Sequence, residues 1–283
     1  MAAGIDRRFG ERPDPGGVRW SFTGPPSDVD TRTRRQRRGR VMGPLEERPA
    51  DAAVRGCQLT PDDRHIGIRC RTESFRCGMS VSEGRLPRMT NIALFHSVLG
   101  VRPGVALAAD RLRAAGHDVL VVDQYEGRVF DDYDEAGEFA QEIGYPTLMR
   151  RAAEAVQGLP DGFIAAGFSN GGGMAEFVAT VRPVRGVLML SGALSLDMIG
   201  VDAWPAGVPA QIHYTAEDPF RSQEGIDAVV AQVSVAGASV EVFDYPGKGH
   251  LFTDASLPAE YDEQAAELLW SRVLPFCAMA RGR

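Results

Sequence analysis

The chain has 283 residues and a formal net charge of −7. This length suits one domain of about 200 residues with an appendage, or two small domains. No apolar run approaches the roughly 18 residues that cross a membrane, and no signal-peptide pattern opens the chain. Four cysteines are too few for a disulfide framework, so we predict a cytoplasmic protein with free thiols and no membrane partner.

Charge is divided unevenly along the chain. Residues 1–88 hold 18 Arg against 12 Asp and Glu, a net of +6, whereas the remainder has a net of −13. A domain this acidic repels a phosphate backbone. We therefore expect no nucleic-acid partner.

Residues 1–88 contain "PDPGG", "GPPSD" and "TRTRRQRRGR" and show no sustained apolar period. Such a segment buries too little apolar area to offset the entropy of ordering. We predict a disordered or non-native N-terminal extension, with residues 89–283 forming the folded domain. A basic arm that touches anionic partners is an alternative.

A metal module is a second alternative for this segment. It would use the metal-competent side chains of Cys57, His65, Cys70 and Cys77. Their spacing lacks the close C-x₂₋₄-C pair that structural zinc sites use, so we predict no metal site.

Strand and helix patterns alternate from Met89 onward. We predict strands over 91–97, 118–123, 162–167, 185–192, 209–216 and 239–245. Helices are predicted over 102–116, 145–159, 171–181, 222–237 and 260–277, and an acidic loop enters a further helix within 125–139. Most strands are continuous apolar runs, which are buried on both faces in a parallel sheet covered by helices. The pattern predicts a single α/β domain.

The stretch "GFSNG", residues 167–171, fits G-x-S-x-G between a predicted strand and a predicted helix. The turn is so tight that glycine is needed two residues before and two after the serine. Ser169 is then forced outward at a helix N-terminus, where the dipole favours a developing anion. We interpret Ser169 as a nucleophile.

A serine hydroxyl needs a base, and the base needs an orienting acid. His250 follows the last strand in a glycine-rich loop, and Asp218 follows the preceding strand. The order Ser169, Asp218, His250 is that of α/β-hydrolases. Glu217 is the alternative acid, but Pro219 fixes the turn after Asp218. Of the other histidines, we expect a structural role for His213 within its strand and a surface position for His117.

An oxyanion requires two N–H donors. We predict the backbone N–H groups of Asn170 and Val98, the latter in the loop after the first strand. His96 and Ser97 border the same cleft as possible pocket residues. The acidic loop after the second strand supplies three candidates for part of a lid: Tyr125, Phe130 and Tyr133.

Residues 89–279 resemble the dienelactone hydrolase family of α/β-hydrolases. The resemblance rests on "LFHSVLGVRPG", "GFSNGGGMA", "HYTAEDPF" and "PGKGHLF", in the family's order. It implies a three-layer α/β-hydrolase fold with a mostly parallel sheet. The sheet begins abruptly at residue 91, which predicts a minimal core without a large cap. The resemblance also implies the triad Ser169, Asp218 and His250 and the oxyanion N–H groups of Val98 and Asn170, and such a serine mechanism needs no cofactor.

Three departures from the family pattern bear on the substrate. Ser169 and Ser97 stand where the best-known members carry cysteine and glutamate, and Asp254 stands where they carry an arginine that holds a carboxylate. An acid there repels a carboxylate. We expect a monomeric or homodimeric serine hydrolase whose small-molecule substrate is a neutral ester, lactone or thioester.

Two other functions fit parts of the sequence. A non-catalytic binding protein can share the hydrolase fold. A nucleotide-binding module would use "GFSNGGG" to hold a phosphate, but the stretch lacks the G-x-G-x-x-G spacing and the Lys-Ser/Thr of a P-loop.

Overall fold

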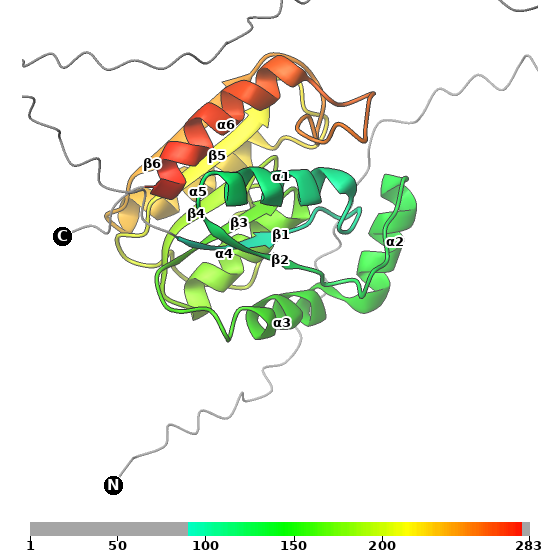
Figure 1. The fold of residues 1–283 in the computed structure, drawn as a ribbon. Helices are drawn as coiled ribbons and strands as arrows, with labels where there is room; N and C mark the ends of the chain where they lie inside the picture. The colour runs from blue at the N-terminus through cyan, green and yellow to red at the C-terminus, as the bar shows by residue number, and fades with distance from the viewer. Residues whose placement is uncertain (1–89, 279–283) are drawn as a thin grey trace, which may run out of the picture. The chain divides into compact units, whose positions relative to one another are not determined.

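The computed structural model describes residues 90–278. The predictions for residues 1–88 lie outside the described residues. Every strand and helix predicted after Met89 is present (Figure 1). The strands are β1 (Asn91–Phe95), β2 (Asp118–Val122), β3 (Phe163–Phe168), β4 (Val184–Leu190), β5 (Ala210–Thr215) and β6 (Val240–Tyr245). The helices are α1 (Pro103–Ala114), α2 (Tyr133–Ile143), α3 (Tyr145–Ala155), α4 (Asn170–Val181), α5 (Gln223–Val235) and α6 (Glu263–Ala278).

The six strands form one parallel sheet in the order β2-β1-β3-β4-β5-β6. From β1 the chain first moves outward to β2 and then returns to the far side of β1 with β3. Ligands of open parallel sheets bind at the carboxyl ends of the strands, where the direction of winding reverses. The loops that follow β1 and β3 are therefore where a site is expected.

Helices cover both faces of the sheet. Helices α1 and α6 lie on one face, and α3 and α4 lie on the other (Figure 1). A bidentate pair between Arg111 and Glu267, with both N–O distances at 2.5 Å, joins α1 to α6. Between β2 and β3 the chain inserts α2 and α3 without a large cap. The three-layer minimal fold is confirmed.

Burial follows the place of each strand in the sheet. All six residues of β3 and all six of β5 are buried, because each strand has a neighbour on both sides and helices above and below. The edge strands β2 and β6 are partly exposed. Within residues 90–278, no helix combines the length and apolarity that a membrane span requires.

Two histidines outside the site illustrate the core. His213 on β5 is fully buried and hydrogen-bonds Tyr245 (2.8 Å) and Gln211 (3.2 Å), so its expected structural role is confirmed. The prediction of a surface position for His117 is wrong, because its side chain is 5% exposed. The turn at Gly116 directs His117 inward. The backbone N–H of His117 donates to the Leu112 carbonyl in the last turn of α1.

Candidate active site

Ser169 occupies a strained turn between β3 and α4. Its φ of 51° and ψ of −117° are unusual for a residue with a side chain. A Cβ on Gly167 would lie 1.9 Å from the Gly171 carbonyl oxygen, and one on Gly171 would lie 2.5 Å from that of Phe95. Both glycines are thus required by close backbone contacts, which is the physical reason predicted for this turn.

The end of β4 supports the same turn. The N–H of Ser169 donates to the Leu190 carbonyl at 2.7 Å. A Cβ on Gly192 would lie 1.9 Å from the Ser169 carbonyl oxygen, so the chain after β4 packs directly against the turn. The role of Gly192 was not predicted, because a glycine two residues beyond a strand does not reveal which backbone lies against it.

The structure brings Ser169, His250 and Asp218 together. The Ser169 Oγ lies 2.7 Å from His250 Nε2, and His250 Nδ1 lies 2.7 and 2.9 Å from the two carboxylate oxygens of Asp218. All three residues are buried, with exposures of 6%, 3% and 6% respectively. His250 can therefore accept the serine proton at Nε2 while Asp218 fixes the proton at Nδ1.

Local turns place the acid and the histidine. Asp218 Oδ1 accepts the Phe220 N–H at 2.8 Å in the turn after β5, which fixes the carboxylate. Glu217, the alternative acid, is exposed, and the structure pairs His250 with Asp218 instead. The Thr215 hydroxyl donates to the Gly249 carbonyl at 2.9 Å, which ties the His250 loop to the end of β5.

His96 is placed as a structural residue. Its Nε2 accepts the Gln124 N–H at 3.1 Å, so Nδ1 carries the proton and donates to the Ser97 carbonyl at 2.6 Å. Complete burial lowers the pKa of His96, which keeps the ring neutral. Both ring nitrogens are used by the backbone, so His96 holds the loop after β1 and does not line an open cleft.

The loop after β1 folds back on itself. The Ser97 hydroxyl accepts the Leu99 N–H at 3.2 Å, and the Ser97 carbonyl accepts the Gly100 N–H at 3.1 Å. Gly100 has a φ of +84°, and a Cβ there would lie 2.3 Å from the Arg128 carbonyl oxygen. In the described part of the chain, no group accepts a hydrogen bond from the Val98 N–H.

Asn170 begins α4, and the first N–H groups of a helix have no intrahelical acceptor. Val98 and Asn170 thus both offer donors near the carboxyl ends of β1 and β3. An oxyanion needs two such donors, and the assignment of these two stays a prediction.

Aromatic rings cover His250. The Phe220 and Tyr133 rings lie 4.6 and 6.0 Å from the imidazole, and 5.3 Å from each other. Of the three lid candidates, Tyr125 and Phe130 are instead buried, with exposures of 2% and 5%. Both pack edge-on or tilted against Phe139 of α2, because the apolar side of that helix needs partners.

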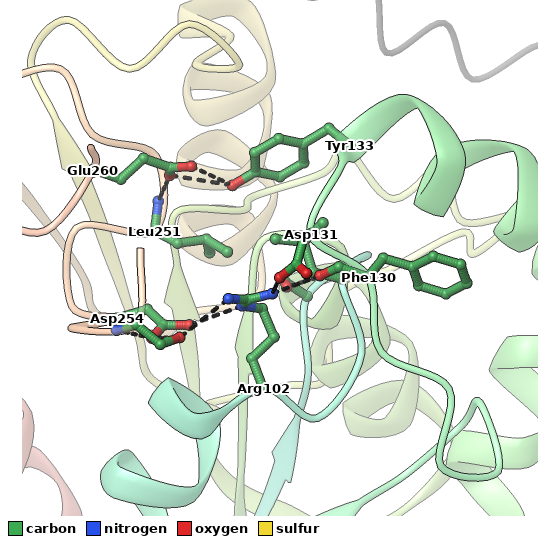
Figure 2. Close-up of polar contacts among 10 residues, drawn as sticks. Arg102, Phe130, Asp131, Tyr133, Leu251, Asp254 and Glu260 are labelled. Atoms are coloured by element: carbon green, nitrogen blue, oxygen red, sulfur yellow. Dashed lines mark hydrogen bonds and ion pairs between the residues drawn. The ribbon is translucent and has the colours of Figure 1, made fainter. Parts of the chain in front are cut away.

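Asp254 is paired with a buried arginine. The Arg102 Nε lies 3.5 Å from Asp254 Oδ2, and the Arg102 Nη1 donates to both the Asp131 carboxylate and the Phe130 carbonyl at 2.6 Å (Figure 2). A Cβ on Gly104 would lie 2.2 Å from Asp254 Cγ, so α1 begins directly against this acid. The pair was not predicted, since Arg102 and Asp254 are far apart in the chain.

A narrow pocket lies beside this pair. It is lined by Ser97, Arg102, Gly104, Val105, Phe168, Leu251, Thr253 and Asp254. Ser97 thus lines a pocket, but Ser169 and His250 are not among the lining residues, so the predicted place of Ser97 on the cleft of the active site stays a prediction. Within residues 90–278, no group of three or more His, Cys, Asp or Glu side chains is arranged to hold a metal ion.

Comparisons with known proteins identify the family. The model of the dienelactone hydrolase family matches residues 79–280. The dienelactone hydrolase-like promiscuous phosphotriesterase P91, from metagenomic libraries, is a similar solved structure, with 23% identity, a TM-score of 0.58, and 69% of this chain and 88% of that chain covered. A structure named m3DLH has 22% identity and a TM-score of 0.52, with 68% of this chain and 86% of that chain covered.

These likenesses, at under 25% identity, show a shared fold. No curated protein matches the chain. The family match covers most of the chain, including every residue of the candidate site. The chain therefore belongs to the dienelactone hydrolase family and is a hydrolase.

Proposed function

We propose that this hydrolase cleaves small uncharged esters, lactones or thioesters through an acyl-enzyme formed on Ser169. The observation that carries the proposal is the continuous contact from Ser169 Oγ to His250 Nε2 and from His250 Nδ1 to Asp218. A buried carboxylate–imidazole–hydroxyl relay of this geometry activates serine in several unrelated folds.

Acylation begins with proton transfer. His250 accepts the hydroxyl proton at Nε2 as Ser169 Oγ attacks the carbonyl carbon, and Asp218 stabilises the resulting imidazolium. The negative charge moves to the carbonyl oxygen, where the N–H groups of Val98 and Asn170 are the proposed donors. His250 then gives its proton to the leaving alcohol or thiol, whose bond to carbon breaks to leave the acyl-serine.

Deacylation repeats the sequence with water. His250 removes a proton from the water molecule that attacks the acyl carbon. The second tetrahedral intermediate collapses as His250 returns the proton to Ser169 Oγ. A carboxylic acid is released, and the enzyme regains its starting protonation without a cofactor.

Charge near the site favours an uncharged substrate. The Arg102 Nη1 donates to Asp131 and to the Phe130 carbonyl, and Asp254 lies 3.5 Å from Nε, so protein acids already offset the charge of this guanidinium. Two aromatic rings, of Phe220 and Tyr133, pack against His250. An uncharged phosphotriester shares this neutrality, and the name of the similar protein P91 is a reason to include such a triester among the substrates tested.

The test is the time course of product release from a short-chain aryl ester. We expect an initial burst close to one product per protein, followed by a slower steady state, because acylation by a good leaving group outpaces deacylation. Ser169→Ala removes the nucleophile, and we expect it to lose at least about 10⁴-fold in kcat. Wild-type protein that is folded yet inert across short acyl chains and phosphotriesters contradicts the proposal and favours a non-catalytic binding protein.

A further inference from the structure

Glu260 contacts two elements of the candidate site at once. Its Oε2 accepts the N–H of Leu251, the residue after His250, at 2.6 Å. The Tyr133 hydroxyl lies 3.0 and 3.1 Å from the two oxygens of the same carboxylate (Figure 2). Burial and the neighbouring Glu260 carboxylate both raise the pKa of Tyr133, so this hydroxyl keeps its proton and donates it.

Tyr133 is the residue of α2 that lies over His250. Its ring centroid is 6.0 Å from the imidazole, and Ser169 and His250 are 6% and 3% exposed behind this cover. A movement of the Tyr133 ring away from His250 would widen access to Ser169, and it would require the hydroxyl to leave Glu260.

Besides the hydrogen bond between Tyr133 and Glu260, a second set of contacts holds residues 130–133, and it is made by Arg102. Arg102 donates to the Phe130 carbonyl and to Asp131, just before Tyr133, and its Nε faces Asp254 (Figure 2). Residues 130–133 are thus connected to the loop 250–260, which carries His250, by the Arg102 contacts and by the Tyr133–Glu260 hydrogen bond. Arg102 is 6% exposed and has several partners, so we expect its contacts to persist. Among the residues that the structure describes, the Tyr133 hydroxyl is held by Glu260 alone, so its hydrogen bond is the one that can break.

Backbone contacts fix the position of Glu260. A Cβ on Gly249 would lie 2.0 Å from the Glu260 carbonyl oxygen, so the two backbones are in contact beside His250. The Glu260 N–H donates to the Leu257 carbonyl at 2.9 Å. Because its backbone is fixed in this way, the Glu260 carboxylate is positioned to accept hydrogen bonds from both Leu251 and Tyr133.

We propose that Glu260 is a positioning residue that couples closure of Tyr133 over the site to the placement of His250. The inference rests on the proposed hydrolase function of Ser169. The two contacts have separable effects. The Tyr133 contact controls access to Ser169, whereas the Leu251 contact sets the position of the imidazole and therefore the chemical step.

Three variants of the whole 283-residue chain separate the contacts. Tyr133→Phe removes the hydroxyl and keeps the ring. Glu260→Gln keeps an oxygen that can accept the Leu251 N–H, and Glu260→Ala removes both contacts. Tyr261→Phe and Glu263→Gln are matched controls, because both side chains are exposed and lie in the neighbouring segment.

Two quantities are measured for each protein. The first is kcat and KM for a short-chain aryl ester. The second is the ratio of the labelling rate constants for a bulky and a small alkyl fluorophosphonate, which reports how readily the cover opens. Thermal unfolding is recorded beside them, so that a change in stability is seen separately.

We expect Tyr133→Phe to raise the bulky-to-small ratio by about threefold or more, with kcat within about threefold of wild type, the scale of one lost hydrogen bond. Glu260→Ala should raise the ratio similarly and lower kcat by about tenfold or more, since small displacements of a catalytic group are costly. Glu260→Gln should recover most of that kcat. The effects of Tyr133→Phe and Glu260→Ala on the ratio should not add, because they break one contact.

Some outcomes overturn the inference while the hydrolase function stands. One is active wild type with unchanged ratios in Tyr133→Phe and Glu260→Ala. Another is a loss of kcat that Glu260→Gln does not recover and that follows the loss of thermal stability, which indicates a merely structural residue. Inactive, unlabelled wild type instead refutes the proposed function itself.

Discussion

Asp254 is the residue whose interpretation the structure changes most. The sequence presents it as a lone acid where related enzymes carry an arginine. In the structure it faces the Arg102 Nε at 3.5 Å and also accepts hydrogen bonds from the Ser256 N–H and hydroxyl at 2.8 and 2.6 Å. The acid is therefore hydrogen-bonded by Ser256 and ion-paired with Arg102, although within residues 90–278 the buried Arg102 Nε finds no hydrogen-bond acceptor. The predicted exclusion of carboxylates then follows from an occupied Arg102 as much as from repulsion by Asp254.

The occupied Arg102 predicts selectivity against charged acyl chains. For two aryl esters of equal chain length, one ending in a methyl group and one in a carboxylate, kcat/KM should be lower for the carboxylate by about tenfold or more. The physical reason is that an acyl carboxylate would lose its hydration without gaining a free cation. Steady-state kinetics with the matched pair give the ratio.

Asp254→Asn supplies the matched variant. Its amide oxygen still accepts from Ser256, while removal of the negative charge should reduce the discrimination between the two esters. Asp202→Asn changes an exposed acid and should keep the wild-type ratio. Equal or better cleavage of the carboxylate ester by wild type would contradict the assignment of an uncharged substrate.

At the residue scale, the sequence predicts what lies at strand ends. Ser169, Asp218 and His250 could be placed together because each follows a strand of one parallel sheet. Glu260 and Arg102 could not, because both act through loops whose packing has no sequence period. His96 also shows this limit, since its type suggests a pocket, whereas its two backbone hydrogen bonds make it structural.

The turn at Ser169 is the element on which the site depends. Its backbone is held from one side by the Leu190 carbonyl and from the other by Gly171 against Phe95. Gly192 completes the support, since its Cα lies where any side chain would meet the Ser169 carbonyl. Displacement at this point moves Ser169 relative to His250.

Gly192→Ala should therefore disturb both stability and catalysis. A Cβ would lie 1.9 Å from the Ser169 carbonyl oxygen, so the backbone must shift. We expect a loss of about 1–3 kcal/mol in the free energy of unfolding, as for overpacked sites. We also expect about a 100-fold loss in kcat, the scale of a 1 Å misplacement. Urea unfolding and burst kinetics measure the two effects.

Gly137→Ala is the matched control within α2. A Cβ there would meet nothing within 4 Å, and alanine is favoured over glycine inside a helix by about 1 kcal/mol. We expect this variant to be as stable as wild type or more stable. Near-wild-type activity in Gly192→Ala would show that the end of β4 does not position Ser169.

At the element scale, the order and type of every strand and helix after Met89 could be read from apolar runs, helical spacing and glycine or proline boundaries. The edge strand β6 is present as predicted but is more exposed than the central strands, because it has a neighbour on one side only. The sequence of the loop between β2 and α2 shows no regular spacing of apolar residues from which burial could be predicted. Its aromatic residues Tyr125 and Phe130 therefore looked like lid residues, although they are buried.

Stability of the whole molecule depends on a buried polar network that the proposed mechanism does not use. His213 lies between Tyr245 and Gln211, and Gln211 donates to Glu241 at 2.9 Å. Burial lowers the pKa of His213 to about 3, and the positive charge of Arg272 contributes in the same direction. The ordinary value in an unfolded chain is 6.5.

The sign of the effect follows from proton binding. Between pH 6.5 and about pH 3, the unfolded chain binds a proton at His213 that the folded protein excludes. Acidification through this window therefore favours the unfolded state, by up to about 1.4 kcal/mol per pH unit. Above pH 6.5 both states are neutral at this residue, and its contribution is constant.

His213→Gln removes this titration and should flatten the pH dependence. Urea unfolding of wild type and variant between about pH 4 and 7 gives both curves, and their difference isolates His213 from the carboxylates common to both. The variant should lose less stability than wild type as the pH falls. Parallel curves would mean that His213 binds its proton over the same pH range in the folded and unfolded states, which contradicts the lowered pKa.

At the scale of the whole molecule, the sequence predicted one α/β domain after Met89 and its hydrolase family. The winding of the sheet then explains the site, because β1 and β3 are neighbours where the direction of winding reverses. Which loops pack over the carboxyl ends of β1 and β3 depends on many weak side-chain contacts. The arrangement of these loops could therefore be described only from the structure.

The central claim is that Ser169 is the nucleophile of an acyl-enzyme. The most direct measurement is the intact mass and peptide map of the 283-residue chain after reaction with a small alkyl fluorophosphonate. We predict one phosphonyl group per chain, attached at Ser169, and none in Ser169→Ala. Folded wild-type protein without the adduct, or an adduct that persists in Ser169→Ala, would contradict this claim.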